Sequence, residues 1–128
     1  MPKYIEDDIV KYNDKIMVIK EPRDGSHFDL FCPQEGSVYC LVDVEEIKPI
    51  PITSEILEKN RWKKKMYCDW CHYLPIEGNI LYLSKGIGID GAFSVDVGQG
   101  MSHIACISFV HQLQHLFFGF GLSSKMEV

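Results

Sequence analysis

The chain lacks any apolar run long enough to cross a bilayer, and its first eight residues contain no apolar stretch typical of a signal peptide. We therefore expect a cytoplasmic protein that does not span a membrane. The sequence also lacks the polar bias of a disordered chain, because 46% of its 128 residues are hydrophobic and 24% are charged. Such a composition is ordinary for a globular protein with one core or two small units.

Positive charge is scarce in the N-terminal part. Residues 1–52 hold six Lys or Arg against eleven Asp or Glu, whereas residues 53–128 hold seven of each. Nucleic-acid binding depends on clustered cations, so we do not expect nucleic acid as the main partner. The one basic cluster, residues 61–65, makes Arg61 and Trp62 interaction candidates, since an aromatic ring between cations can stack on a base. A solvated turn beside a short helix explains the same cluster.

The five cysteines are an odd number in a chain without an export signal, which indicates reduced thiols rather than a disulfide framework. Cys68 and Cys71, followed by His72, match the c-type haem attachment pattern, but such attachment belongs to exported proteins. These two thiols are also metal candidates, with Cys32, Cys40 or histidines completing a zinc site. A second close cysteine pair is missing, so we expect packed free thiols and no bound cofactor.

Short strands separated by turns dominate the pattern up to the prolines of residues 48–53, which break regular structure. Asn13 and Asp14 indicate a hairpin turn, and Thr53 is the expected N-cap of a short helix. Further strands follow, in which Phe93 and Val95 alternate with polar residues as in a strand with one buried face. The expected strands are 8–12, 15–20, 27–32, 37–44, 66–73, 79–84, 92–97 and 101–107, with helices over 54–60 and after Ser108.

The C-terminal helix carries an apolar stripe at spacings of three and four residues, formed by Phe109, Val110, Leu113, Leu116, Phe117 and Phe120. We expect the stripe to pack on the preceding sheet. His111 and His115 stand four residues apart on the remaining surface, where they are metal candidates. A zinc-protease helix would carry glutamate after the first histidine, but this chain has Gln112. Two half-exposed histidines that hydrogen-bond to neighbours or water explain the pair better than a metal site does.

The sequence contains no motif that predicts catalysis. No serine has the context of a nucleophile elbow, and the glycines of residues 86–91 match a dinucleotide fingerprint only in letters, because a strand follows where a helix is required. The carboxylates Asp90 and Asp96 cannot be assigned to a shared cleft. We therefore expect no catalytic residues and no enzyme.

Residues 47–57, Trp62 and residues 110–114 together resemble a family of small proteins from Bacteroidetes gut bacteria, their prophages and their phages. The resemblance implies an accessory role inside a bacterial host cell and transfers no catalytic residues. The first strands, after Asp7 and Asp8, also look like an SH3-like barrel, a fold that serves many unrelated functions.

These observations predict an α+β fold in two parts. Residues 1–52 form an acidic, SH3-like β-barrel, and residues 53–128 form a short helix and an antiparallel meander packed against the C-terminal helix. The leading hypothesis is a non-enzymatic phage or prophage protein that binds a host or phage protein; Phe118, off the apolar stripe, suggests a homo-oligomer. The alternatives are a protein that sequesters a small ligand or a metal and, third, a nucleic-acid-associated regulator.

Overall fold

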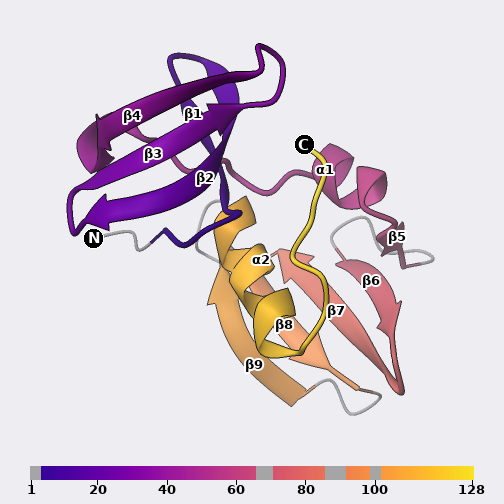
Figure 1. The fold of residues 1–128 in the computed structure, drawn as a ribbon. Coiled ribbons are helices and arrows are strands. Elements are labelled where there is room, and N and C mark those ends of the chain that lie inside the picture. Colours follow the sequence, from indigo (N-terminus) through magenta and orange to yellow (C-terminus); the bar gives the residue numbers. More distant parts are fainter. Residues whose placement is uncertain (1–3, 66–70, 86–91, 99–101) are drawn as a thin grey trace. The chain divides into compact units, whose positions relative to one another are not determined.

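In a computed structural model of the chain, residues 4–65, 71–85, 92–98 and 102–128 are described. The fold is α+β, with two antiparallel sheets and one main helix (Figure 1). The chain divides into two compact units. Unit 1 comprises Met1–Ile50 and Phe109–Met126, and unit 2 comprises Pro51–Ser108 and Glu127–Val128.

The sheet of unit 1 has four antiparallel strands, β1 (Ile9–Tyr12), β2 (Lys15–Asp24), β3 (His27–Cys32) and β4 (Ser37–Asp43), in that order. The hairpin predicted at Asn13 and Asp14 is confirmed, because Tyr12 pairs with Lys15 and the two turn residues have φ values of 50° and 60°. Positive φ at both central residues is the mark of a type I′ turn, which matches the twist of the flanking strands.

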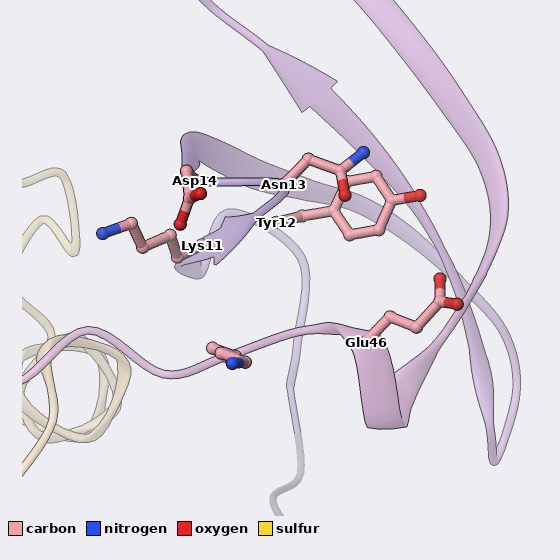
Figure 2. Close-up of a pocket in the computed structure, with 6 residues that line it drawn as sticks. Lys11, Tyr12, Asn13, Asp14 and Glu46 are labelled. Atoms are coloured by element: carbon pink, nitrogen blue, oxygen red, sulfur yellow. The ribbon is translucent and has the colours of Figure 1, made fainter.

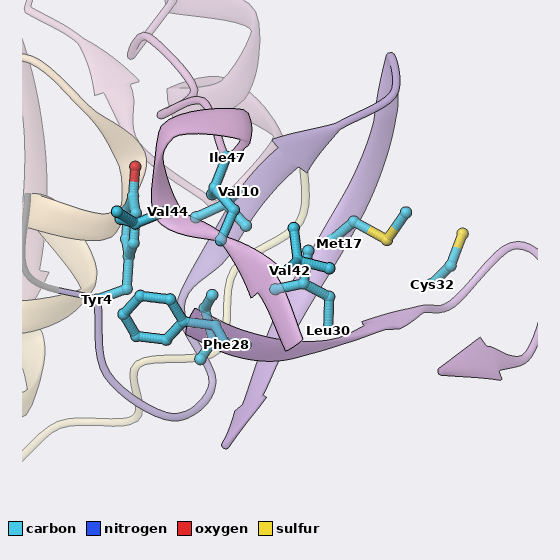
Figure 3. Packing of buried hydrophobic residues seen from close by; sticks show 10 residues of the cluster. Tyr4, Val10, Met17, Phe28, Leu30, Cys32, Val42, Val44 and Ile47 are labelled. Carbon is cyan, nitrogen blue, oxygen red and sulfur yellow. The ribbon is translucent and has the colours of Figure 1, made fainter. Parts of the chain in front are cut away.

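The core of unit 1 consists of apolar side chains from all four strands, from the segment before β1 and from the segment that follows β4 (Figure 3). A short 3-10 helix, η1 (Val44–Glu46), turns the chain after β4 and contributes buried Val44. The buried cluster is formed by Tyr4, Val10, Met17, Ile19, Phe28, Leu30, Cys32, Val42, Val44 and Ile47.

The described sheet of unit 1 is open. A single antiparallel bridge between Lys11 and Lys48 lies beside β1, and no closed barrel is found among the residues that the structure describes. The α+β prediction is therefore confirmed, while the finer prediction of an SH3-like barrel is not.

Unit 2 begins with α1 (Ser54–Lys59), for which the predicted cap is confirmed because the Thr53 hydroxyl accepts a hydrogen bond from the Ile56 amide at 3.2 Å. The antiparallel sheet that follows has the order β5 (Lys63–Lys64), β6 (Cys71–Ile76), β7 (Asn79–Lys85), β8 (Phe93–Val97) and β9 (Ser102–Ile107). Phe93 and Val95 are buried, as their alternation predicted. The expected strand 66–73 overlaps β6 only from Cys71, since residues 66–70 lie outside the described ranges.

The main helix, α2 (Val110–Gly119), belongs to unit 1, whereas we expected it in the second part of the chain. The apolar stripe predicted a buried face but could not predict which sheet the helix joins. Buried Val110, Leu113 and Phe117 agree with the stripe, but Phe120 follows the helix end and is 41% exposed. The chain leaves unit 1 after Ile50, within the proline segment expected to connect the two parts.

The C-terminal residues are held by side chains of α1 and its cap. The Asn60 side chain accepts a hydrogen bond from the Glu127 amide at 2.8 Å and donates one to the Glu127 carbonyl at 2.7 Å. Sequence patterns give no signal for such a contact, because the two residues are 67 positions apart.

Candidate functional site

Gln114 attaches α2 to the chain before and within β1. Its side-chain oxygen accepts a hydrogen bond from the Ile9 amide at 2.8 Å, and its nitrogen donates to the carbonyls of Asp7 and Ser124, both at 2.9 Å. The side chain is only 1% exposed. Gln114 lies off the apolar stripe of the helix, yet it is buried because these backbone groups replace water as its partners.

His115 also contacts the segment before β1. Its Nε2 lies 2.8 Å from the buried carboxylate of Asp8, which accepts a further hydrogen bond from the Ile5 amide. Burial raises the pKa of Asp8, although the Ile5 amide and His115 act in the opposite direction. The contact with the Asp8 carboxylate therefore fixes the position of the His115 ring.

His111 is buried, although we expected it to be half-exposed. Its ring stacks on Phe109, and it meets Tyr4 and His115 edge-on with centroid distances of 4.9 and 5.6 Å. Burial, with a smaller effect of His115, lowers the pKa of His111 to about 4. The ring is therefore neutral at physiological pH, and its Nδ1 has no hydrogen-bond partner in the part of the chain that the structure describes.

The other sequence candidates are dispersed. Cys68 lies outside the described residues, and Cys71 is buried, with its thiol 3.5 Å from the Ser84 hydroxyl. Within the described ranges, no group of three or more His, Cys, Asp or Glu side chains could hold a metal ion. No helix in these ranges is long and apolar enough to cross a membrane.

The three interaction candidates have different environments. Trp62 is 2% exposed and belongs to the core of unit 2, so its ring is not available to stack on a base. Arg61 is exposed, and its φ of 73° places it in the turn after α1. Phe118 is 70% exposed near the end of α2.

Sequence reasoning missed an apolar surface on β4, an edge strand of the unit 1 sheet (Figure 1). Val38 is 55% exposed and Leu41 is 61% exposed, while Cys40 between them is also exposed. An edge strand offers unpaired backbone donors and acceptors to another chain. The sequence predicted this strand, but nothing in its pattern showed that it would lie at an edge.

Leu41 has an unusual backbone conformation. Its φ is 54°, a left-handed conformation that costs a residue with a Cβ atom about 1–2 kcal/mol. The pairing of β4 with β3 shifts here, so that Cys40 and Leu41 together lie opposite Asp29. This β-bulge turns Leu41 outward and removes its amide from the ladder.

The carboxylate of Asp29 supports the bulge from the neighbouring strand. One oxygen accepts the Leu41 amide at 3.0 Å, and the other accepts Nε and Nη2 of Arg23 at 2.7 and 2.6 Å. Arg23, followed by the Leu41 amide, lowers the pKa of Asp29. The side chain of Asp29 is buried, and both of its oxygens accept hydrogen bonds that compensate its charge. The same contacts give the Leu41 amide a partner outside the strand ladder.

Acidic side chains lie at both ends of β4. Glu35 precedes the strand and pairs with Lys15. At the other end, Asp43 is the last residue of the strand, and Glu45 and Glu46 follow it in η1; all three are exposed. The surface is therefore an apolar centre between acidic ends. We call Val38, Cys40 and Leu41 with these flanking acids the β4 edge.

A pocket of ≈ 390 Å³ lies between the β1–β2 turn and the segment after η1 (Figure 2). Its lining carries two lysines and two acids, so its charge does not select a single ion. Tyr12 from this lining meets Tyr39 of β4 edge-on, with 5.8 Å between ring centroids. The lining residues are Lys11, Tyr12, Asn13, Asp14, Glu46 and Lys48.

Comparisons with known proteins find no relative of this chain. No protein-family model, no curated protein and no solved structure matches the chain.

Proposed function

We propose that this chain is a non-enzymatic accessory protein that binds a partner protein, and that the β4 edge binds an extended segment of that partner as an additional strand. The exposed apolar pair Val38 and Leu41 on an edge strand carries the proposal. In strand addition, backbone hydrogen bonds supply affinity while alternate side chains supply specificity.

The strain at Leu41 supports a role beyond folding. Soluble proteins usually protect sheet edges with charged side chains or proline, whereas the centre of β4 presents leucine and valine. The buried Asp29 carboxylate holds the bulge that exposes Leu41. Backbone strain of this kind persists where the surrounding structure enforces it, and it concentrates at functional sites.

The charges beside β4 define the partner. Because Asp43, Glu45 and Glu46 are exposed next to the apolar centre, a segment with alternating apolar residues and flanking lysine or arginine fits best. A second copy of this chain would bring the same acids together. The bulge also interrupts long regular pairing between edges, which favours a short segment over another β4 strand.

The resemblance to phage and prophage proteins suggests that the partner is a host or phage protein in a bacterial cytoplasm. A relation of unit 1 to SH3-like barrels is part of the same proposal. It is supported by the Lys11–Lys48 bridge beside β1 and by the Tyr12–Tyr39 contact. A second candidate function, binding of a small ligand, is supported by the ≈ 390 Å³ pocket.

Selection from a displayed library of random peptides tests the proposal. We expect the full chain to enrich peptides with alternating apolar residues flanked by lysine or arginine, and the same selection on a Val38→Lys variant to lose them. Bound peptide should also shield Cys40 from alkylation, because Cys40 lies between the two exposed apolar residues. Peptides that bind both proteins equally, or leave Cys40 reactive, would contradict strand addition at β4.

Leu41→Asn should separate stability from binding. Asparagine tolerates the left-handed conformation, so we expect the free energy of unfolding to rise by about 0.5–1 kcal/mol. Loss of the apolar side chain should weaken a selected peptide about tenfold, or about 1.4 kcal/mol. Urea denaturation and peptide titration measure the two effects.

Val38→Asn is the matched control, because it removes an exposed apolar side chain without any strain to relieve. It should weaken the peptide without raising stability. Equal stability changes in the two variants would show that the conformation of Leu41 stores no strain.

A further inference from the structure

Cys106 on β9 has a base beside it. Its Sγ lies 3.9 Å from Nε2 of His103, and the other ring nitrogen of His103 lies 2.8 Å from Ser94 Oγ and 3.4 Å from Asp96 Oδ1. The thiol is exposed, as is 55% of the His103 side chain, so a reagent can reach the sulfur from solvent.

The pairing of β8 with β9 builds this cluster. Ser94 is the cross-strand partner of Cys106, and Asp96 is the partner of His103. Because strand residues alternate between faces, Ser94 and Asp96 lie on the face opposite buried Phe93. A register irregularity between Val95 and Asp96 shifts the pairing by one residue. Ser94 and Asp96 are therefore two positions apart on β8, while their partners Cys106 and His103 are three positions apart on β9. The cluster is therefore held by the strand backbones.

The arrangement suits proton transfer better than metal binding. Sulfur and carboxylate lie at opposite ring nitrogens of His103, so they do not converge on one point, in keeping with the lack of a metal-holding group within the described ranges. When the His103 Nδ1–H donates to Ser94 Oγ or Asp96, the lone pair of Nε2 faces the thiol. A nucleophile, a base and a group that orients the base are the parts that activate a cysteine.

We propose that Cys106 is a site of reversible thiol–disulfide exchange with low-molecular-weight disulfides. His103 Nε2 takes the thiol proton, and the Cys106 sulfur attacks one sulfur of the disulfide. A new S–S bond forms as the old one breaks, so that Cys106 is oxidised to a mixed disulfide. The leaving half is reduced to a thiol and takes its proton from the His103 imidazolium. Asp96 and Ser94 are positioning residues that orient the ring.

The test follows the modification of each cysteine of the full-length reduced chain by oxidised glutathione, resolved by tandem mass spectrometry. We expect His103→Asn to slow modification of Cys106 about tenfold, as for loss of a modest general base. The exposed Cys40 in unit 1 is the internal reference, and its rate should not change. Buried Cys71 reports on folding of unit 2, because it reacts only when that unit opens.

An unchanged rate at Cys106 in folded His103→Asn would overturn the proposal. If that variant exposes Cys71, then Asp96→Asn decides, since it keeps the size of the side chain and disturbs only the orientation of His103. A loss of about threefold at Cys106 is expected there, and an unchanged rate would again overturn the proposal.

Discussion

Replacement of Gln114 by alanine lowers the free energy of unfolding by about 3 kcal/mol, since each buried group left without its partner costs about 1–3 kcal/mol. The variant loses hydrogen bonds to the Ile9 amide and to the carbonyls of Asp7 and Ser124. The site is almost closed to solvent, so water does not readily replace the side chain. Urea denaturation followed by circular dichroism measures the loss.

Gln112→Ala is the matched control on the same helix. Its side-chain oxygen accepts the Phe109 amide at 3.1 Å at the helix start, in a half-exposed position. Loss of a cap contact costs about 0.5–1 kcal/mol. Similar losses in both variants would contradict the role of Gln114 in attaching α2 to the segment around β1.

Acidification from pH 7 to pH 4 should destabilise the wild-type chain by about 2 kcal/mol relative to a His111→Phe variant, after allowance for partial solvent screening. The pKa of His111 falls from 6.5 to about 4 on folding, mainly because the ring is buried. Above pH 6.5 the ring is neutral in both states and the fold is fully stable. Between pH 6.5 and pH 4 only the unfolded chain takes up the proton, so stability falls as the pH falls.

The comparison with His111→Phe separates this effect from the groups that face the ring. Asp8 acts in the opposite direction, because its raised pKa lets the folded state take up a proton first. His115 contacts the ring, and burial raises the pKa of Tyr4 far above this pH window. Phenylalanine keeps the ring contacts without the proton. Parallel stability curves for the two proteins between pH 7 and pH 4 would contradict a buried, neutral His111.

Local patterns predicted the elements that depend on local chemistry. The Asn13–Asp14 turn, the Thr53 cap and the alternation around Val95 each follow from a few neighbouring residues, and all are confirmed. Such features need no knowledge of distant partners, because turn geometry, capping and strand periodicity act within one element.

The features that decide the candidate site depend on distant residues. Gln114 and His111 are polar, so the helix pattern placed them on the surface, but Gln114 is satisfied by Ile9, which lies 105 positions away. The positive φ of Leu41 depends on a buried carboxylate from the neighbouring strand. The same limit explains why the helix pattern did not predict that α2 belongs to unit 1, since an apolar stripe does not specify its partner.

Hydrogen exchange of backbone amides, measured by NMR with and without a selected peptide, tests the central claim most directly. Strand addition pairs the edge of β4 that no described strand occupies, so amides within Ser37–Asp43 should exchange about tenfold more slowly in the complex. Amides of β1 should change little, because β1 lies at the other end of the sheet order. Unchanged exchange across β4 in a saturated complex, with protection elsewhere, would contradict the proposal that this edge is the binding site.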